Sequence, residues 1–163
     1  MHWRALLCTV VMCLVTAAHP PSPANADPDI IGPAVITDGD TIKIDGQRIR
    51  LHGIDAPEAA QTCQADGEAW GCGQAATEAL KNLTEGKEVR CEERDVDRYD
   101  RIVAVCCAGG VDLNEEMVRL GLALAYRRYS LDYVEEEEEA QAESVGMWRG
   151  EFVSPWEWRA SQK

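Results

Sequence analysis

Alternating apolar and polar positions near the start of the chain predict a β-hairpin. Residues 41–44 alternate like a half-buried strand, Asp45-Gly46 is typical of a tight two-residue turn, and residues 48–51 alternate again. The same alternation returns in residues 87–94 and 101–107, which predicts a second hairpin.

Helical patterns separate and follow the two hairpins. Residues 74–84 place apolar side chains on one helix face, a short second helix begins at Asp112 or Asn114, and a third covers residues 131–146. Residues 122–126 can form a last strand. Strands gathered early and interrupted by helices indicate an α+β domain with a small antiparallel barrel.

The first 26 residues have the features of an export signal. A short cationic start ends at Arg4, an apolar run covers residues 5–18, and Ala24-Asn25-Ala26 forms an A-x-A cleavage site. An uncleaved membrane anchor is the alternative, but the run is too short to span a bilayer comfortably. We expect residues 1–26 to be a cleaved signal peptide. Residues 27–163 then form one domain, secreted or periplasmic, without stable membrane association.

The charge of the mature domain is strongly acidic. Of the 16 basic and 29 acidic side chains in the sequence, only Arg4 lies in the signal, so residues 27–163 carry a formal charge of −14. Such a field repels polyanions and argues against tight, sequence-independent nucleic-acid binding. It does not exclude a nuclease that uses a divalent cation as its local positive charge. Part of the acid, residues 135–139, is interpreted as a solvated helix face.

Five cysteines follow the signal, and an odd number in an oxidising compartment implies two bridges and one free thiol. They are Cys63, Cys72, Cys91, Cys106 and Cys107. Cys63–Cys72 can close a polar loop, and Cys91–Cys106 can join the two strands of the second hairpin. A Cys91–Cys107 bridge is the rival, but Cys107 points the opposite way off its strand, so we predict that Cys107 is free. A zinc site is disfavoured because the mature chain has no C-x-x-C and a single histidine.

An acidic cluster around the first hairpin indicates a cation site. Asp40 begins the first strand, whereas Asp55 and Glu58 follow the second, so the antiparallel pairing brings them to one rim. Three acids without a basic partner repel one another, and a hard cation with oxygen ligands is a reason to assemble them. Arg50, on the adjacent strand, can hold an anionic substrate against that cation.

Several segments, taken together and in order, resemble the staphylococcal-nuclease-like (thermonuclease) family. Residues 38–41 (Asp-Gly-Asp-Thr), Arg50-Leu51 and residues 54–58 (Ile-Asp-Ala-Pro-Glu) look like its signature. Residues 97–101 (Asp-Arg-Tyr-Asp-Arg) resemble its second motif, and residues 120–126 resemble the segment before its active-site tyrosines. The similarity covers roughly residues 34–148.

The resemblance implies an α+β fold, a five-stranded OB-fold β-barrel with three helices, and a Ca²⁺-dependent phosphodiesterase activity. It assigns catalysis to Arg50, Glu58 and Arg101, and Ca²⁺ ligation to Asp40, Asp55 and the backbone carbonyl of Ala56. Glu58 would orient or deprotonate the attacking water, and the two arginines would hold the phosphate. The family often has threonine where Ala56 stands, a change that a carbonyl ligand survives.

The same resemblance suggests further substrate contacts. Arg98 and Tyr99 match positions that contact a terminal phosphate, Tyr126 matches a phosphate-contacting tyrosine, and Tyr129 can stack on a base. Asp100 stands where the family commonly has glycine, and we expect its charge to lower the affinity for polyanions.

The sequence therefore predicts a monomeric, exported, disulfide-stapled nuclease that acts on DNA and RNA, breaks the 5′ P–O bond and leaves 3′-phosphates. Single strands and frayed ends should be preferred. The alternative is a non-catalytic OB-fold module of the cell envelope that binds nucleic acid or a protein. The aromatic tail, residues 148–163, is expected to pack back over the domain. Whether DNA or RNA is the natural substrate, and whether Mn²⁺ can replace Ca²⁺, stays open at this stage.

Overall fold

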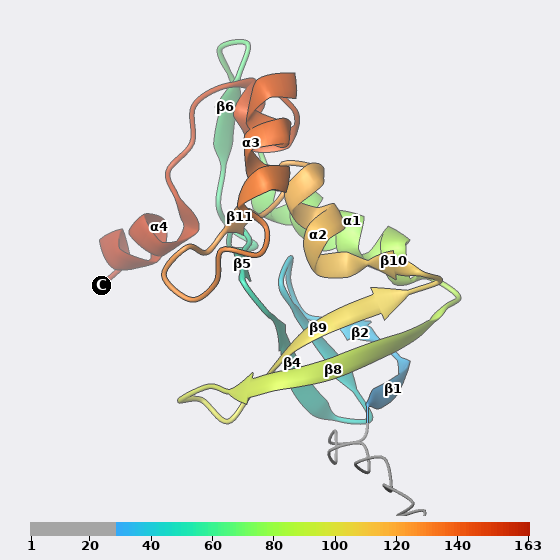
Figure 1. Ribbon diagram of the computed structural model, residues 1–163. Coiled ribbons are helices and arrows are strands. Elements are labelled where there is room, and N and C mark those ends of the chain that lie inside the picture. Colours follow the sequence, from blue (N-terminus) through green and yellow to red (C-terminus); the bar gives the residue numbers. More distant parts are fainter. Residues whose placement is uncertain (1–28) are drawn as a thin grey trace, which may run out of the picture.

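A computed structural model of the protein describes residues 29–163 and shows a strongly curved sheet with helices gathered at one end (Figure 1). The strand order is β1-β8-β9-β4-β3-β2, with β10 paired to β9. These strands are β1 (Ile30–Pro33), β2 (Val35–Ile36), β3 (Thr41–Ile44), β4 (Gln47–Leu51), β8 (Glu88–Val96), β9 (Ile102–Ala108) and β10 (Val111–Asp112). The predicted signal peptide lies outside the described residues.

The sheet closes into a barrel because its two outer strands are one piece of chain. Ala34 alone separates β1 from β2, so a single segment pairs with β8 at one end and with β3 at the other. Counting that segment once gives five strands, and β4–β9 is the parallel pair among antiparallel neighbours. This confirms the expected α+β OB-fold barrel.

The first hairpin forms as its sequence predicts. Asp45 and Gly46 have φ values of 49° and 82°, as a two-residue hairpin turn requires. The register pairs Thr41 with Arg50 and Ile42 with Ile49, so the isoleucines face inward together. This pairing sets the start of β3 beside the end of β4, where the acidic residues lie.

The three expected helices are present, together with a fourth and a 3₁₀ turn. They are α1 (Cys72–Thr84), α2 (Leu113–Arg119), α3 (Val134–Glu143), η1 (Gly146–Arg149) and α4 (Pro155–Ser161). Asp112 caps α2 by accepting hydrogen bonds from the backbone N–H groups of Asn114 and Glu115. The third helix is shorter than predicted, and α4 forms within the aromatic tail. In Figure 1, α4 lies apart from the other helices, beside the short strands β5 (Ile54–Asp55) and β11 (Leu124–Ala125).

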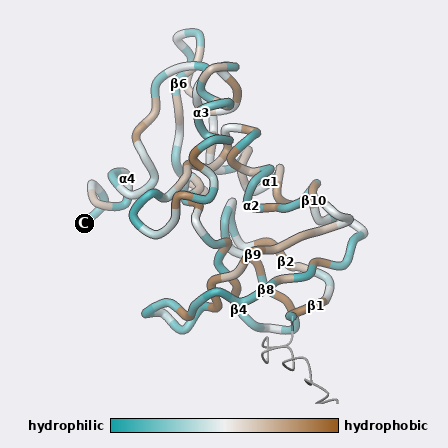
Figure 2. The backbone as a smooth tube through the Cα atoms, in the orientation of Figure 1, coloured by the Kyte–Doolittle hydropathy of each residue, from teal (hydrophilic) through white to brown (hydrophobic). Residues whose placement is uncertain are grey.

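The barrel shares its main apolar core with α1 and α2, and a smaller cluster packs Met147 of η1 against Cys63, Cys72 and Leu124. Side chains from the inner faces of β3, β4, β8 and β9 meet the covering faces of α1 and α2. Fully buried members include Ile42, Ile44, Ile49, Leu51, Leu80, Val89, Leu113 and Met117. Figure 2 shows hydrophobic positions interleaved with hydrophilic ones along the strands, and a largely hydrophilic connection at the tip of the β8–β9 hairpin. Within residues 29–163 no helix is both long and apolar enough to cross a membrane.

Both predicted disulfides are present. Cys63, which opens the small β6 (Cys63–Ala65) and β7 (Glu68–Trp70) hairpin, is bonded to Cys72 at the start of α1. Cys91 and Cys106 are register partners on β8 and β9 and are bonded to each other. Cys107 is free and partly exposed, as expected. The bridges consume four of the five thiols, which excludes the zinc alternative among these residues.

The interpretation of residues 135–139 as a solvated face holds for Glu135, Glu138 and Glu139, but Glu136 is half-buried and Glu137 is buried. Glu137 is only 8% exposed. Its carboxylate accepts a hydrogen bond from Ala125 N at 2.9 Å and pairs with Arg127 at 2.7 Å. Glu137 therefore fastens α3 to β11 and the loop that follows it.

Candidate active site

Asp40 and Asp55 meet at the barrel rim, and the guanidinium of Arg50 lies between them. Arg50 Nη1 is 2.8 Å from Asp40 Oδ1, and Nη2 is 2.7 Å from Asp55 Oδ1. Asp55 is fully buried and Asp40 is 5% exposed. Two carboxylates removed from water need positive charge beside them, and Arg50 supplies part of it.

Backbone contacts hold Asp40 beside the segment that follows β5. Oδ2 of Asp40 accepts a hydrogen bond from Ala56 N at 3.0 Å, and its carbonyl accepts one from Leu51 N at 2.8 Å. Gly39 permits this closeness, because a Cβ there would lie 2.7 Å from Ala76 Cβ and 2.8 Å from Ala56 Cβ. The Asp-Gly-Asp-Thr segment thus needs glycine at position 39 for packing.

Glu58 is positioned by the loop after β5 and by the start of α1. Its carbonyl accepts a hydrogen bond from Gln61 N at 2.7 Å. At Gly73 a Cβ would collide with that same carbonyl, so α1 begins in direct contact with the Glu58 backbone. The Glu58 carboxylate is about one-third exposed, which leaves it open to solvent and to a substrate.

Arg159, on α4, binds the same carboxylates and is the residue that the sequence did not predict. Its Nη2 is 2.7 Å from Asp55 Oδ2, and its Nη1 lies 3.1 Å from Asp55 Oδ1 and 3.0 Å from Glu58 Oε1. The tail does pack back, as expected, but onto the site itself. The one sequence signal was an arginine among the tryptophans of the tail, which has no distinctive spacing.

The electrostatics of the cluster follow from burial and pairing. Burial raises the pKa of Asp55 above its usual range, while the hydrogen bonds of Arg159 and the charges of both arginines act against that rise. Because two guanidiniums bind its oxygens, we treat Asp55 as ionised. Burial opposes the charged form of Arg159, yet its bonds to Asp55 and Glu58 raise its pKa. Burial and the neighbouring charge of Asp40 raise the pKa of Asp38 to about 6.

Arg101 stands on the same outer face of the barrel as Arg50. Arg50 is the register partner of Val103, and Arg101 precedes Val103 by two positions, so the strand alternation points it the same way. In the described structure Arg101 binds Asp97, with Nη2 at 2.7 Å from Oδ2, and is not bonded to the acids at the rim. Burial alone would raise the pKa of Asp97, but hydrogen bonds from the Arg101 backbone and side chain lower it.

The remaining residues of the second motif lie on the exposed β8–β9 connection. Tyr99 is 59% exposed, and the Arg98 guanidinium lies 4.9 Å from its ring centroid. Asp100 adopts φ 55°, the left-handed angle that glycine usually supplies there, so the turn persists with aspartate. Asp97, rather than Asp100, neutralises Arg101.

Two predicted tyrosines cluster with a tail tryptophan. Tyr126 and Tyr129 pack edge to face with centroids 4.8 Å apart, and Trp156 of α4 stacks on Tyr126 at 5.4 Å with nearly parallel rings. Tyr129 is 67% exposed. One face of Tyr126 is therefore covered by the same helix that brings Arg159 to the acids.

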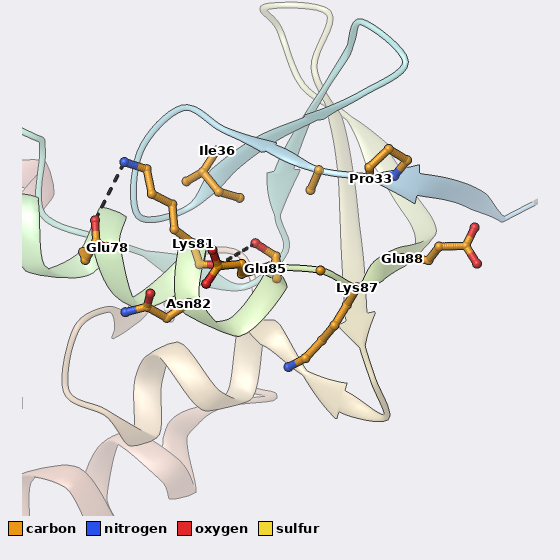
Figure 3. A pocket seen from close by; sticks show the side chains of 11 residues that line it. Pro33, Ile36, Glu78, Lys81, Asn82, Glu85, Lys87 and Glu88 are labelled. Carbon is orange, nitrogen blue, oxygen red and sulfur yellow. Dashed lines mark hydrogen bonds and ion pairs between the residues drawn. The ribbon is translucent and has the colours of Figure 1, made fainter.

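An open hollow elsewhere on the surface does not compete as a catalytic site. It lies between α1 and the β1–β2 segment, and Figure 3 shows Lys81, Glu85 and Asn82 around it with Pro33 and Ile36. The Lys81–Glu78 pair at 3.8 Å there is an ordinary surface contact within α1. The hollow contains none of the predicted site residues.

Comparisons with known proteins point to the same chemistry. Residues 48–150 match the model of a family described as staphylococcal nuclease homologue. An uncharacterized endonuclease of Haemophilus influenzae is 35% identical over 136 residues, which cover 78% of this chain and 71% of that protein. A micrococcal nuclease of Shigella flexneri is 36% identical over 146 residues, covering 78% and 79%. A succinoglycan biosynthesis protein, ExoI, of Rhizobium meliloti is 36% identical over 132 residues, covering 78% and 69%.

Proposed function

Because this chain belongs to the staphylococcal nuclease family and is a nuclease, we propose that it is an exported, calcium-dependent enzyme that hydrolyses the phosphodiester bonds of DNA and RNA. The observation that carries the proposal is the meeting of Asp40, Asp55 and Glu58 at one rim of the barrel. Arg50 binds the two aspartates there, and Arg159 joins Asp55 to Glu58. This arrangement combines anionic groups for a cation and for water activation with a fork of donors for a phosphate.

The family depends on a metal, and the residues at the rim suit a hard cation. The buried carboxylates of Asp40 and Asp55 and the carbonyl of Ala56 are all oxygen donors, the type that hard cations prefer. On the resemblance to the family, we assign the cation to the carboxylates of Asp40 and Asp55, which meet at the rim, and to the carbonyl of Ala56. A bound Ca²⁺ polarises the phosphoryl group and neutralises charge that grows during hydrolysis.

The protein groups supply the rest of the reaction. Glu58, exposed to solvent beside the two aspartates, orients an attacking water and accepts its proton. Arg50 holds the phosphate through paired donors and stabilises charge on its equatorial oxygens. The guanidinium of Arg101, which is paired with Asp97 in the absence of substrate, also binds this phosphate. The phosphorus–oxygen bond on the 5′ side breaks, which leaves a 3′-phosphate and a 5′-hydroxyl.

Substrate preference and location follow from the surface. Exposed Tyr99 and Tyr129 offer stacking faces to unpaired bases, with Arg98 and Tyr126 nearby for phosphates. These faces suit single strands and frayed ends. Two disulfides fit an oxidising compartment, which supports export to the periplasm or the medium.

The experiment incubates the purified protein with denatured DNA, or with RNA, in the presence of Ca²⁺ and then of a calcium chelator. We expect cleavage of both with Ca²⁺, none with chelator, and 3′-phosphate ends on the products. Cleavage that persists in chelator contradicts the calcium requirement. Tight binding without any cleavage supports the non-catalytic OB-fold module instead.

A further inference from the structure

The C-terminal helix brings a second guanidinium to the acids that were assigned to catalysis. Arg159 is separated from Asp55 by 104 residues, yet it contacts both oxygens of that carboxylate and one oxygen of Glu58. Arg50 already occupies Oδ1 of Asp55. Within residues 29–163, Arg159 is the donor that occupies Oδ2.

In this geometry Arg159 competes with a cation for the Asp55 carboxylate. A metal that uses Asp55 needs an oxygen of that carboxylate, and the one that Arg50 leaves is bonded to Arg159. A divalent cation and a guanidinium that lie side by side also repel each other, so each lowers the other's affinity for Asp55. Because such coupling is reciprocal, a residue that lowers the cation's affinity is itself loosened when the cation binds.

The tail is anchored separately from this contact, so Arg159 can leave the acids without detaching the whole segment. Gln61 Nε2 donates to Val153 O at 2.7 Å, and Gln64 N donates to Glu151 O at 2.8 Å. Beyond these anchors α4 begins at Pro155 and meets the body through Trp156 and Arg159. The Arg159 side chain is 35% exposed, so its guanidinium has a direct path to water.

We propose that Arg159 is a further residue of the active site, which occupies the Asp55 oxygen that the cation would use and thereby sets how tightly the cation binds. The inference rests on the proposed cation site. In the cation-free protein Arg159 neutralises the two acids. When the cation binds, Arg159 gives them up and Glu58 becomes free to meet water. A purely structural ion pair that docks the tail would stabilise α4 without this effect on the cation.

The test measures Ca²⁺ affinity directly, by isothermal titration calorimetry at fixed pH and ionic strength, with no substrate present. Arg159→Gln should bind Ca²⁺ about tenfold more tightly than the wild type, a gain of about 1.4 kcal/mol, because the guanidinium that competes for Asp55 is removed. Arg159→Lys keeps the positive charge but loses the paired donors of the guanidinium, so its Ca²⁺ affinity should lie between those of the wild type and Arg159→Gln. Arg128→Gln is the matched control: it removes one exposed positive charge from the loop that carries Tyr126, and should change affinity by less than about twofold.

The outcomes separate this inference from the proposed function. Unchanged or weaker binding in Arg159→Gln, in a variant that melts cooperatively, overturns the role of Arg159 while wild-type binding still supports the cation site. An equal gain in Arg128→Gln also overturns it, since the effect would then be one of overall charge. Absence of Ca²⁺ binding in every variant overturns the cation site and this inference with it. Asp55→Asn should abolish the binding in all backgrounds.

Discussion

Removing the disulfide between β8 and β9 should destabilise the barrel by an amount that the loop length sets. Cys91 and Cys106 are both fully buried and lie 15 positions apart in sequence. In the chain-entropy model, closing a loop of about 15 residues restricts the unfolded chain by about 3 kcal/mol at 25 °C. The double variant Cys91→Ala with Cys106→Ala should therefore lose about 3 kcal/mol of unfolding free energy.

The assay is urea unfolding followed by circular dichroism, with a thermal melt as the second reading. At the size of this domain, 3 kcal/mol corresponds to a fall in Tm of roughly 10 °C. The matched control is Cys107→Ala, which removes a cysteine next to Cys106 and leaves both bridges intact. A loss below about 1 kcal/mol in the double variant, or an equal loss in the control, would refute the reasoning. The Cys63–Cys72 bridge, with a separation of 9, should contribute somewhat less, about 2.6 kcal/mol.

Three further predictions concern single positions. Gly39→Ala places a Cβ within 2.8 Å of two alanine methyls. The variant should lose about 1–3 kcal/mol of unfolding free energy in urea, and its activity should fall because Asp40 shifts. Unchanged stability would contradict the packing. Asp100→Gly removes a negative charge next to Arg101 and keeps the turn, so KM for single-stranded DNA should fall about twofold at low salt with kcat unchanged. An unaltered KM and salt dependence would contradict the hypothesis that Asp100 lowers the affinity for polyanions. Burial, with the charges of Asp112 and Glu92, raises the pKa of Cys107. Its alkylation by iodoacetamide should therefore accelerate at a higher pH than that of an ordinary thiol, whose pKa is about 8.5. A midpoint at or below that value would be inconsistent with the structure.

Much of the fold could be predicted from the sequence because its signals are local. The Asp45-Gly46 turn fixes the register of its hairpin, which sets the start of β3 beside the end of β4, and Asp55 follows that strand by only four residues. Cys91 and Cys106 lie on strands that the alternating pattern defines, and Cys63 and Cys72 lie at the two ends of one short polar loop. In each case the contacts that determine the structure join residues close in sequence, so the residue pattern and spacing are sufficient to predict them.

The parts that escaped prediction depend on contacts across long sequence separations. Arg159 lies more than a hundred residues from the acids that it binds, and a lone arginine has no period to identify it. Glu137 sits in a run of identical residues, and only the fold shows which one of them meets Ala125 N.

The central claim is that Glu58 activates water beside a cation held by Asp40 and Asp55. The most direct measurement compares Glu58→Gln with the wild type for both Ca²⁺ binding and cleavage of denatured DNA. We expect kcat to fall by about 10² to 10⁴, the usual contribution of a positioned base, while the variant still binds Ca²⁺. Cleavage by Glu58→Gln at the wild-type rate, with Ca²⁺ bound, would contradict the account.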